Sequence, residues 1–151
     1  MRRVSILIIA GLALLAACSR SEKVPTGRWI GQYDSADVMV DARLEVQPDG
    51  TVKVSAPDIL GVGDLSEEER MQLHARLADQ LDSTWDKAPA RHMDFDGKVF
   101  RKPGGVAPQM EWDPATREMK VVFYFGMQRS IRIRMTQVTD FSSDPWRVTT
   151  Q

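Results

Sequence analysis

Apolar and polar residues alternate most regularly between residues 37 and 47. One side of this segment is apolar and the other carries Asp41, Arg43 and Glu45, which is typical of an antiparallel strand with one face in water. A Pro-Asp-Gly turn at 48–50 follows, and its glycine suits the left-handed position of a three-residue hairpin loop. This loop predicts three apolar cross-strand pairs: Val46 with Val52, Leu44 with Val54 and Ala42 with Ala56.

Further strands are predicted on both sides of this hairpin. They are a first strand at 27–33, a hairpin of 92–95 and 98–100 around a two-residue Asp96-Gly97 turn, a hairpin of 109–113 and 118–125, and a strand at 129–135. The loop lengths predict the pairs Trp112–Met119, Met110–Val121, Val121–Ile133 and Phe123–Ile131, with Glu111 opposite Lys120 as a charge pair. Residues 140–151, with Phe141, Pro145 and Trp146, are expected to form a strap or a loose tail.

One helix is predicted between residues 66 and 88. Ser66 and Glu69 have the spacing of a capping box, and acidic residues in the first turn suit the positive end of the helix dipole. Leucines and a tryptophan recur every four residues and form one apolar stripe. These are Leu73, Leu77, Leu81 and Trp85. Pro89 ends the pattern.

These elements predict a mainly β (α+β) fold: an antiparallel meander of about eight strands with one helix packed on it. The sheet is expected either to stay open and curved or to close into a small barrel. The helix stripe must leave water, and the inner sheet face is the only apolar surface large enough to cover it. We therefore expect the helix to cross a curved sheet or plug one barrel end, leaving a packed interior without the large internal cavity of a ligand carrier.

The composition narrows the possible chemistry. The formal net charge is −1, which does not favour nucleic acid as a partner, because phosphate binding needs a basic surface. The single cysteine, Cys18, allows no disulfide within the chain. The sequence lacks the Gly-x-Ser-x-Gly, His-Glu-x-x-His and phosphate-binding glycine motifs. We assign no catalytic residue and predict a non-enzymatic protein without a cofactor or metal.

The N-terminus has the layout of a secretory signal peptide. Arg2 and Arg3 precede an apolar run too short to span a membrane, and small residues follow it. Leu15-Ala16-Ala17-Cys18 resembles the lipobox of bacterial lipoproteins. The resemblance implies a signal peptide at 1–17 and an acylated Cys18 carrying palmitate-type chains, which hold stably in a membrane when two or more are present.

That resemblance also implies a location. Ser19 after the cysteine is expected to direct the protein to the outer membrane, facing the periplasm, and inner-membrane retention stays an alternative. Residues 18–26 are then a tether, and residues 27–151 form one β-rich domain.

Gly27 and Trp29 form a Gly-x-Trp at the start of the domain, which resembles that of lipocalins and related calycin barrels. The resemblance implies an arginine of the last strand beside the tryptophan, supplied by Arg132 or Arg134. It also implies a carrier of a small apolar ligand. The predicted helix interrupts the strands earlier than the lipocalin helix does.

Three further groups are candidate sites. His92, Asp94 and Asp96 alternate and have the side chains to bind a divalent metal, although a solvated strand leading into a turn explains them equally well. His74 beside the apolar stripe is interpreted as a boundary residue. The basic residues Lys120, Arg129, Arg132 and Arg134 form a candidate partner surface; the alternative is a solvated sheet face balanced by Glu111 and Glu118.

These observations predict a lipid-anchored, non-enzymatic module that binds an envelope protein or polymer, or helps assemble the envelope. Two alternatives remain. One is the calycin-like carrier. The other is an inhibitor of a wall-degrading enzyme, acting through the Pro103-Gly104-Gly105 loop.

Overall fold

The computed structural model describes residues 23–126 and 128–143. The predicted signal peptide, Cys18 and the first part of the tether lie outside the described residues, as do Pro145 and Trp146 of the C-terminal segment. Val24 at the end of the tether packs against the core of the domain, and Pro25 is buried.

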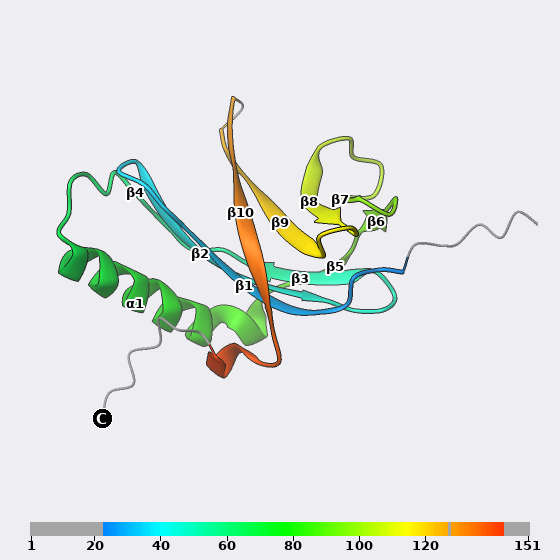
Figure 1. Cartoon of the computed structure of the whole chain (residues 1–151), viewed down its shortest axis with the longest axis horizontal. Helices are drawn as coiled ribbons and strands as arrows, with labels where there is room; N and C mark the ends of the chain where they lie inside the picture. The colour runs from blue at the N-terminus through cyan, green and yellow to red at the C-terminus, as the bar shows by residue number, and fades with distance from the viewer. Residues whose placement is uncertain (1–22, 127, 144–151) are drawn as a thin grey trace, which may run out of the picture.

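The described chain forms one antiparallel sheet of ten strands. Its order is β5-β3-β2-β1-β10-β9-β8-β7-β6, with β4 paired to β2. The strands are β1 (Gly27–Asp34), β2 (Val38–Val46), β3 (Thr51–Ser55), β4 (Asp58–Leu60), β5 (Ala90–His92), β6 (Asp94–Phe95), β7 (Val99–Arg101), β8 (Pro108–Asp113), β9 (Glu118–Phe125) and β10 (Arg129–Val138). The two ends of this order, β5 and β6, are joined through Met93 alone, so the sheet nearly closes into a barrel (Figure 1).

The predicted hairpin registers are confirmed almost throughout. Val46 pairs with Val52 and Leu44 with Val54, and the pairs predicted for β8, β9 and β10 also form. The Ala42–Ala56 pair is not formed, because β3 ends at Ser55 and β4 takes its place beside the start of β2.

The Asp96-Gly97 turn is displaced by one residue. Phe95 pairs with Phe100 and the Asp96 amide donates to the Val99 carbonyl, so the two residues of the turn are Gly97 and Lys98. The Asp96 carboxylate instead accepts bonds from the Arg101 side chain and from the backbone amides of Lys98 and Val99. These bonds lower the pKa of Asp96 to about 2.

The predicted helix is α1 (Glu67–Thr84), extended by a 3-10 turn, η1 (Trp85–Lys87). Both bonds of the capping box form: Ser66 Oγ accepts from the Glu69 amide, and the Glu69 carboxylate accepts from the Ser66 amide. Trp85 therefore lies just past the α-helix, where its ring makes an edge contact with Phe141 of a second 3-10 turn, η2 (Phe141–Ser143).

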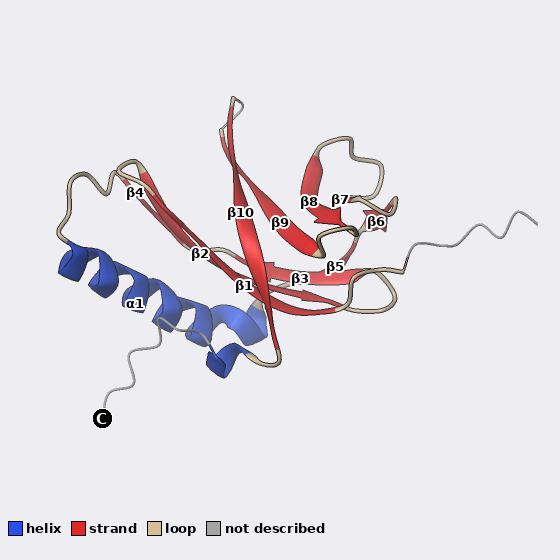
Figure 2. Ribbon diagram, in the orientation of Figure 1, coloured by secondary structure: helices blue, strands red, loops and turns tan. Residues whose placement is uncertain are grey.

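The prediction that α1 covers the inner face of the sheet is wrong. Leu77 packs with Met39 and Val62 on the outer face of β2, and Figure 2 shows the helix lying along the outside of the sheet. The inner face is filled by the strands' own side chains, among them the fully buried Leu44, Phe100 and Met110. Strand β2 is consequently buried on both faces.

Candidate functional site

Strands β1 and β10 separate at one end of the barrel. Their pairing runs from Arg28–Val138 to Gly31–Met135 and stops there. Beyond this point β1 pairs only with β2, and the first half of β10 pairs only with β9, within the described residues. Figure 1 shows the β9–β10 hairpin diverging from the end of the β1–β2 pair.

A pocket of about 720 Å³ lies between these two arms, and we call it the mouth. Its apolar lining consists of Tyr33, Val38, Leu60, Phe125 and Ile131. Its polar lining consists of Ser35, Asp37, Gln128, Arg129 and Ser130. The volume falls within the roughly 300–1,000 Å³ that is usual for ligand pockets. The interior of the barrel is packed as predicted, and the mouth is an open pocket at the end of the barrel, between the two arms.

Gly31 marks the place where the arms part. A Cβ on Gly31 would lie 2.7 Å from the Arg134 carbonyl oxygen and would also clash with Met135 Sδ. Only a glycine therefore lets β1 come this close to β10 at their last pair.

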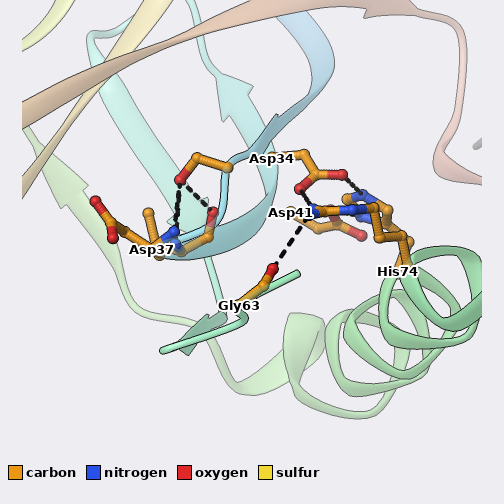
Figure 3. Close-up of polar contacts among 8 residues, drawn as sticks. Asp34, Asp37, Asp41, Gly63 and His74 are labelled. Atoms are coloured by element: carbon orange, nitrogen blue, oxygen red, sulfur yellow. Dashed lines mark hydrogen bonds and ion pairs between the residues drawn. The ribbon is translucent and has the colours of Figure 1, made fainter. Parts of the chain in front are cut away.

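The β1–β2 arm is fastened to α1 by a buried polar network (Figure 3). His74 Nδ1 lies 2.7 Å from Asp41 Oδ1, and His74 Nε2 lies 3.6 Å from Asp34 Oδ2. Arg70 also pairs with Asp34 and donates to the Gly63 carbonyl at 3.3 Å. The side chains of His74 and Asp41 are only 6% and 3% exposed.

The charge state of His74 follows from these contacts. Burial of the imidazole lowers its pKa, but the hydrogen bond to Asp41 and the negative charges of Asp41 and Asp34 raise it, and the net result is a raised pKa. The protonated ring donates from Nδ1 to Asp41 and forms an ion pair with Asp34 on its Nε2 side. The network therefore holds the end of β1 against the helix.

A second ion pair fastens the other half of the helix. Arg43 on β2 lies 2.7 Å from Asp82 of α1, and its side chain is 3% exposed. Its guanidinium also lies 5.3 Å from the centre of the Phe141 ring, a cation–π distance. Polar residues of β2 that look solvated in the sequence are thus the contacts that dock the helix.

The network is enclosed at His74. Both nitrogens of His74 face carboxylates, and the ring is closed off from solvent. Within the described residues, no group of three or more histidine, cysteine, aspartate or glutamate side chains is placed to hold a metal ion. We interpret the network as a support that sets the position of the mouth.

The predicted metal candidates are dispersed. His92 is exposed on β5 and pairs with Thr51, Asp94 pairs with Arg101, and Asp96 belongs to the turn before β7. These three residues serve strand pairing and turn formation.

The four predicted basic residues do not share one face. Lys120, Arg132 and Arg134 lie on the outer face of β9 and β10, whereas Arg129 lines the mouth and pairs with Asp37 across it at 3.2 Å. The outer three share two carboxylates. Arg132 binds Glu111 at 3.0 Å, and Glu118 accepts from Lys120 at 3.1 Å and from Arg134 at 3.2 Å. The hydrogen bond from Lys120 and the positive charges beside Glu118 lower its pKa.

Glu111 and Lys120 lie opposite each other on β8 and β9, as predicted, but their side chains do not form the predicted ion pair. Glu111 reaches diagonally to Arg132 instead, and Lys120 binds Glu118 on its own strand.

Trp29 is buried in the barrel core, 2% exposed. Neither predicted arginine partner lies beside it: Arg132 and Arg134 point to the outer face of the sheet, with side chains 51% and 75% exposed. The loop at 103–105 is exposed, and Val106 after it is 90% exposed.

Sequence reasoning missed the site's main residues. In the sequence, Asp41 and Arg43 have the pattern of a wet strand face, and His74 has that of a helix boundary residue. The only signal on that face was Met39, an apolar residue among polar ones, which marks the position that Leu77 covers. The mouth itself had no signal beyond Gly31.

No helix in the described part of the chain combines the length and apolar character needed to cross a membrane. The chain matches no family model, no curated protein and no solved structure.

Proposed function

We propose that this protein is a lipid-anchored, non-enzymatic binding module of the bacterial cell envelope, held in the outer membrane and facing the periplasm. Leu15-Ala16-Ala17-Cys18 supports the anchor. The mouth carries the proposed binding function, since it combines an open pocket of about 720 Å³ with a wall fixed by a buried network.

The anchor is tested by replacing Cys18 with serine. We expect Cys18→Ser to move the protein from the membrane to the soluble fraction in detergent-free fractionation, because no acyl chain is attached. Ser19→Ala, which keeps the cysteine, is the control and should stay in the membrane fraction. Membrane association of Cys18→Ser would contradict the anchor.

The binding site is tested by crosslinking. Leu60 lines the mouth and is 65% exposed, whereas Val106 is 90% exposed on a loop that does not line it. A photoreactive residue at position 60 should capture a specific envelope component in intact cells, and the same residue at 106 should not. Equal capture at both positions, or none at 60, would refute the mouth as the binding site.

The second candidate is a carrier of a small apolar ligand. The volume of the mouth favours it, because pockets of this size are usual for small-molecule ligands. A carrier would bind an environment-sensitive apolar dye at one saturable site from which fatty acids displace it. Absence of such binding would exclude the carrier and leave the non-enzymatic binding module as the proposed function.

A further inference from the structure

The separation of β1 and β10 leaves two strand edges facing the mouth. In an antiparallel pair, alternate residues direct their amide and carbonyl groups to opposite neighbours. The Ser35 amide donates to the Val38 carbonyl, which fixes the alternation in β1 and, through its pairing with β10, in that strand as well. By this alternation, Ser130 and Arg132 point their backbone groups toward the mouth, where the described residues provide no backbone partner.

These edges differ from an ordinary protected edge. Sheet edges are normally shielded by a bulge, an inward charge or a covering segment, since unpaired amides and carbonyls invite another strand. Here the β10 edge borders the mouth, whose apolar lining includes Ile131, Phe125 and Tyr33. Among the described residues, one ion pair crosses the opening, between Asp37 and Arg129, whose side chains are 72–75% exposed. Such an exposed pair opposes an entering segment weakly.

The side chains along β10 specify what an added strand must carry. Ile131 and Ile133 face the barrel side, so the residues beside them on an added strand would point into the mouth. Arg132 and Arg134 face outward. Together with Lys120 they share two carboxylates, those of Glu111 and Glu118, so one positive charge is in excess. Directly opposite residues of an antiparallel pair interact, and opposite charges there are favourable.

We propose that the mouth binds an extended peptide segment by strand addition to the β10 edge. The segment alternates apolar residues, which enter the pocket, with acidic residues, which face Arg132 and Arg134. This inference rests on the proposed binding function and names its ligand class. Backbone hydrogen bonds supply affinity, and the two rows of side chains supply specificity.

The test measures binding of fluorescent synthetic peptides of about eight residues to the purified full chain in detergent micelles. A peptide that alternates valine and glutamate should bind at one saturable site. A peptide that alternates valine and lysine should bind about tenfold more weakly, because it faces the arginines with like charge. N-methylation of alternate amides should abolish binding, because it removes the donors needed for strand pairing.

A matched pair of protein variants tests the edge itself. Ser130→Pro removes an amide that points to the mouth while leaving the bonds to β9, and Ser130→Thr keeps that amide. We expect the proline variant to lose about tenfold in affinity for the valine–glutamate peptide, and the threonine variant to lose clearly less than the proline variant does. If Ser130→Pro fails to fold, the N-methylated peptide gives the same test on the unaltered protein.

The outcomes separate the inference from the proposed function. Equal binding of the N-methylated and unmodified peptides, or of the lysine and glutamate peptides, overturns strand addition. Capture of a non-peptide component at position 60 overturns it while leaving the binding function. A dimer of the wild type that Ser130→Pro dissolves overturns it in favour of a second copy at this edge. Absence of both capture and peptide binding removes both proposals.

Discussion

The two arms of the mouth are built differently. The β1–β2 arm is covered on its outer face by α1, with Met39 against Leu77 and Asp41 against His74. The β9–β10 arm has no helix behind it in the described part of the chain, and its outer face carries exposed ion pairs and Tyr124, 44% exposed.

This difference assigns a role to each arm. Buried packing and buried ion pairs fix the β1–β2 arm, so it forms a constant wall of the mouth. The inner face of the β9–β10 arm packs in the barrel core, but its outer face is held by exposed ion pairs, which contribute little per contact. It is therefore the arm with an edge available to a ligand. The following changes test this division.

The largest expected effect is on the contact between helix and sheet. Leu77 is 1% exposed, and Leu77→Ala should lower the free energy of unfolding by about 2–5 kcal/mol, because it leaves a cavity against Met39. Ile131→Ala, the matched change in the half-buried lining of the other arm, should cost clearly less. Urea denaturation of both variants measures the difference. Equal losses of unfolding free energy in the two variants would contradict the claim that the β1–β2 arm is the more firmly packed one.

His74→Gln should cost about 1.5–3 kcal/mol near pH 6, since it removes the charged hydrogen bond to Asp41 and the ion pair with Asp34. The folded pKa of His74 is raised above the ordinary value of 6.5. The stabilisation by the protonated ring is therefore complete below pH 6.5 and is lost as the pH rises through the folded pKa.

Denaturation of the wild type and of His74→Gln between about pH 6 and 9 measures this loss. The difference in unfolding free energy between the two proteins should shrink as the pH rises. His92→Gln, a change on the exposed face of β5, is the control. A difference that grows with pH would contradict the sign of the His74 pKa shift.

Gly31→Ala tests the point where the arms meet. The added methyl would press on the Arg134 carbonyl and on Met135, and overpacking of this kind costs about 1–3 kcal/mol. Shortening Met135 to alanine in the same protein should not restore stability, because the backbone clash remains. Thermal unfolding checks both variants, and full rescue by Met135→Ala would show that the backbone contact is unimportant.

The smallest effect is expected across the opening. Asp37→Asn removes the ion pair with Arg129, which is largely exposed, and should change the free energy of unfolding by less than about 1 kcal/mol. The same variant should bind the valine–glutamate peptide at least as well as the wild type, since it removes the ion pair that crosses the mouth. A large loss of stability would show that the two arms support each other.

The hairpins could be predicted because their causes are local. The loop at 48–50 and the alternation beside it fix the Val46–Val52 pair together. The docking of the helix could not be predicted, because Asp41 and Arg43 are indistinguishable in the sequence from solvated strand residues. Their burial depends on His74 and Asp82, which only the fold brings to them. The mouth forms because β1 and β10 separate after Gly31. The alternation of apolar and polar residues indicates where strands form, but it does not indicate where two paired strands separate.

The position of β1 in the sheet also determines when folding can finish. The first strand of the domain lies between β2 and the last strand, with Arg28 beside Val138. During synthesis from the N-terminus, β1 has one neighbour as soon as β2 emerges, but its second arrives only with the final residues of the sheet. Contacts between distant segments form slowly. An incomplete chain therefore exposes the β1 edge to aggregation, and folding can be completed only after β10 has been made.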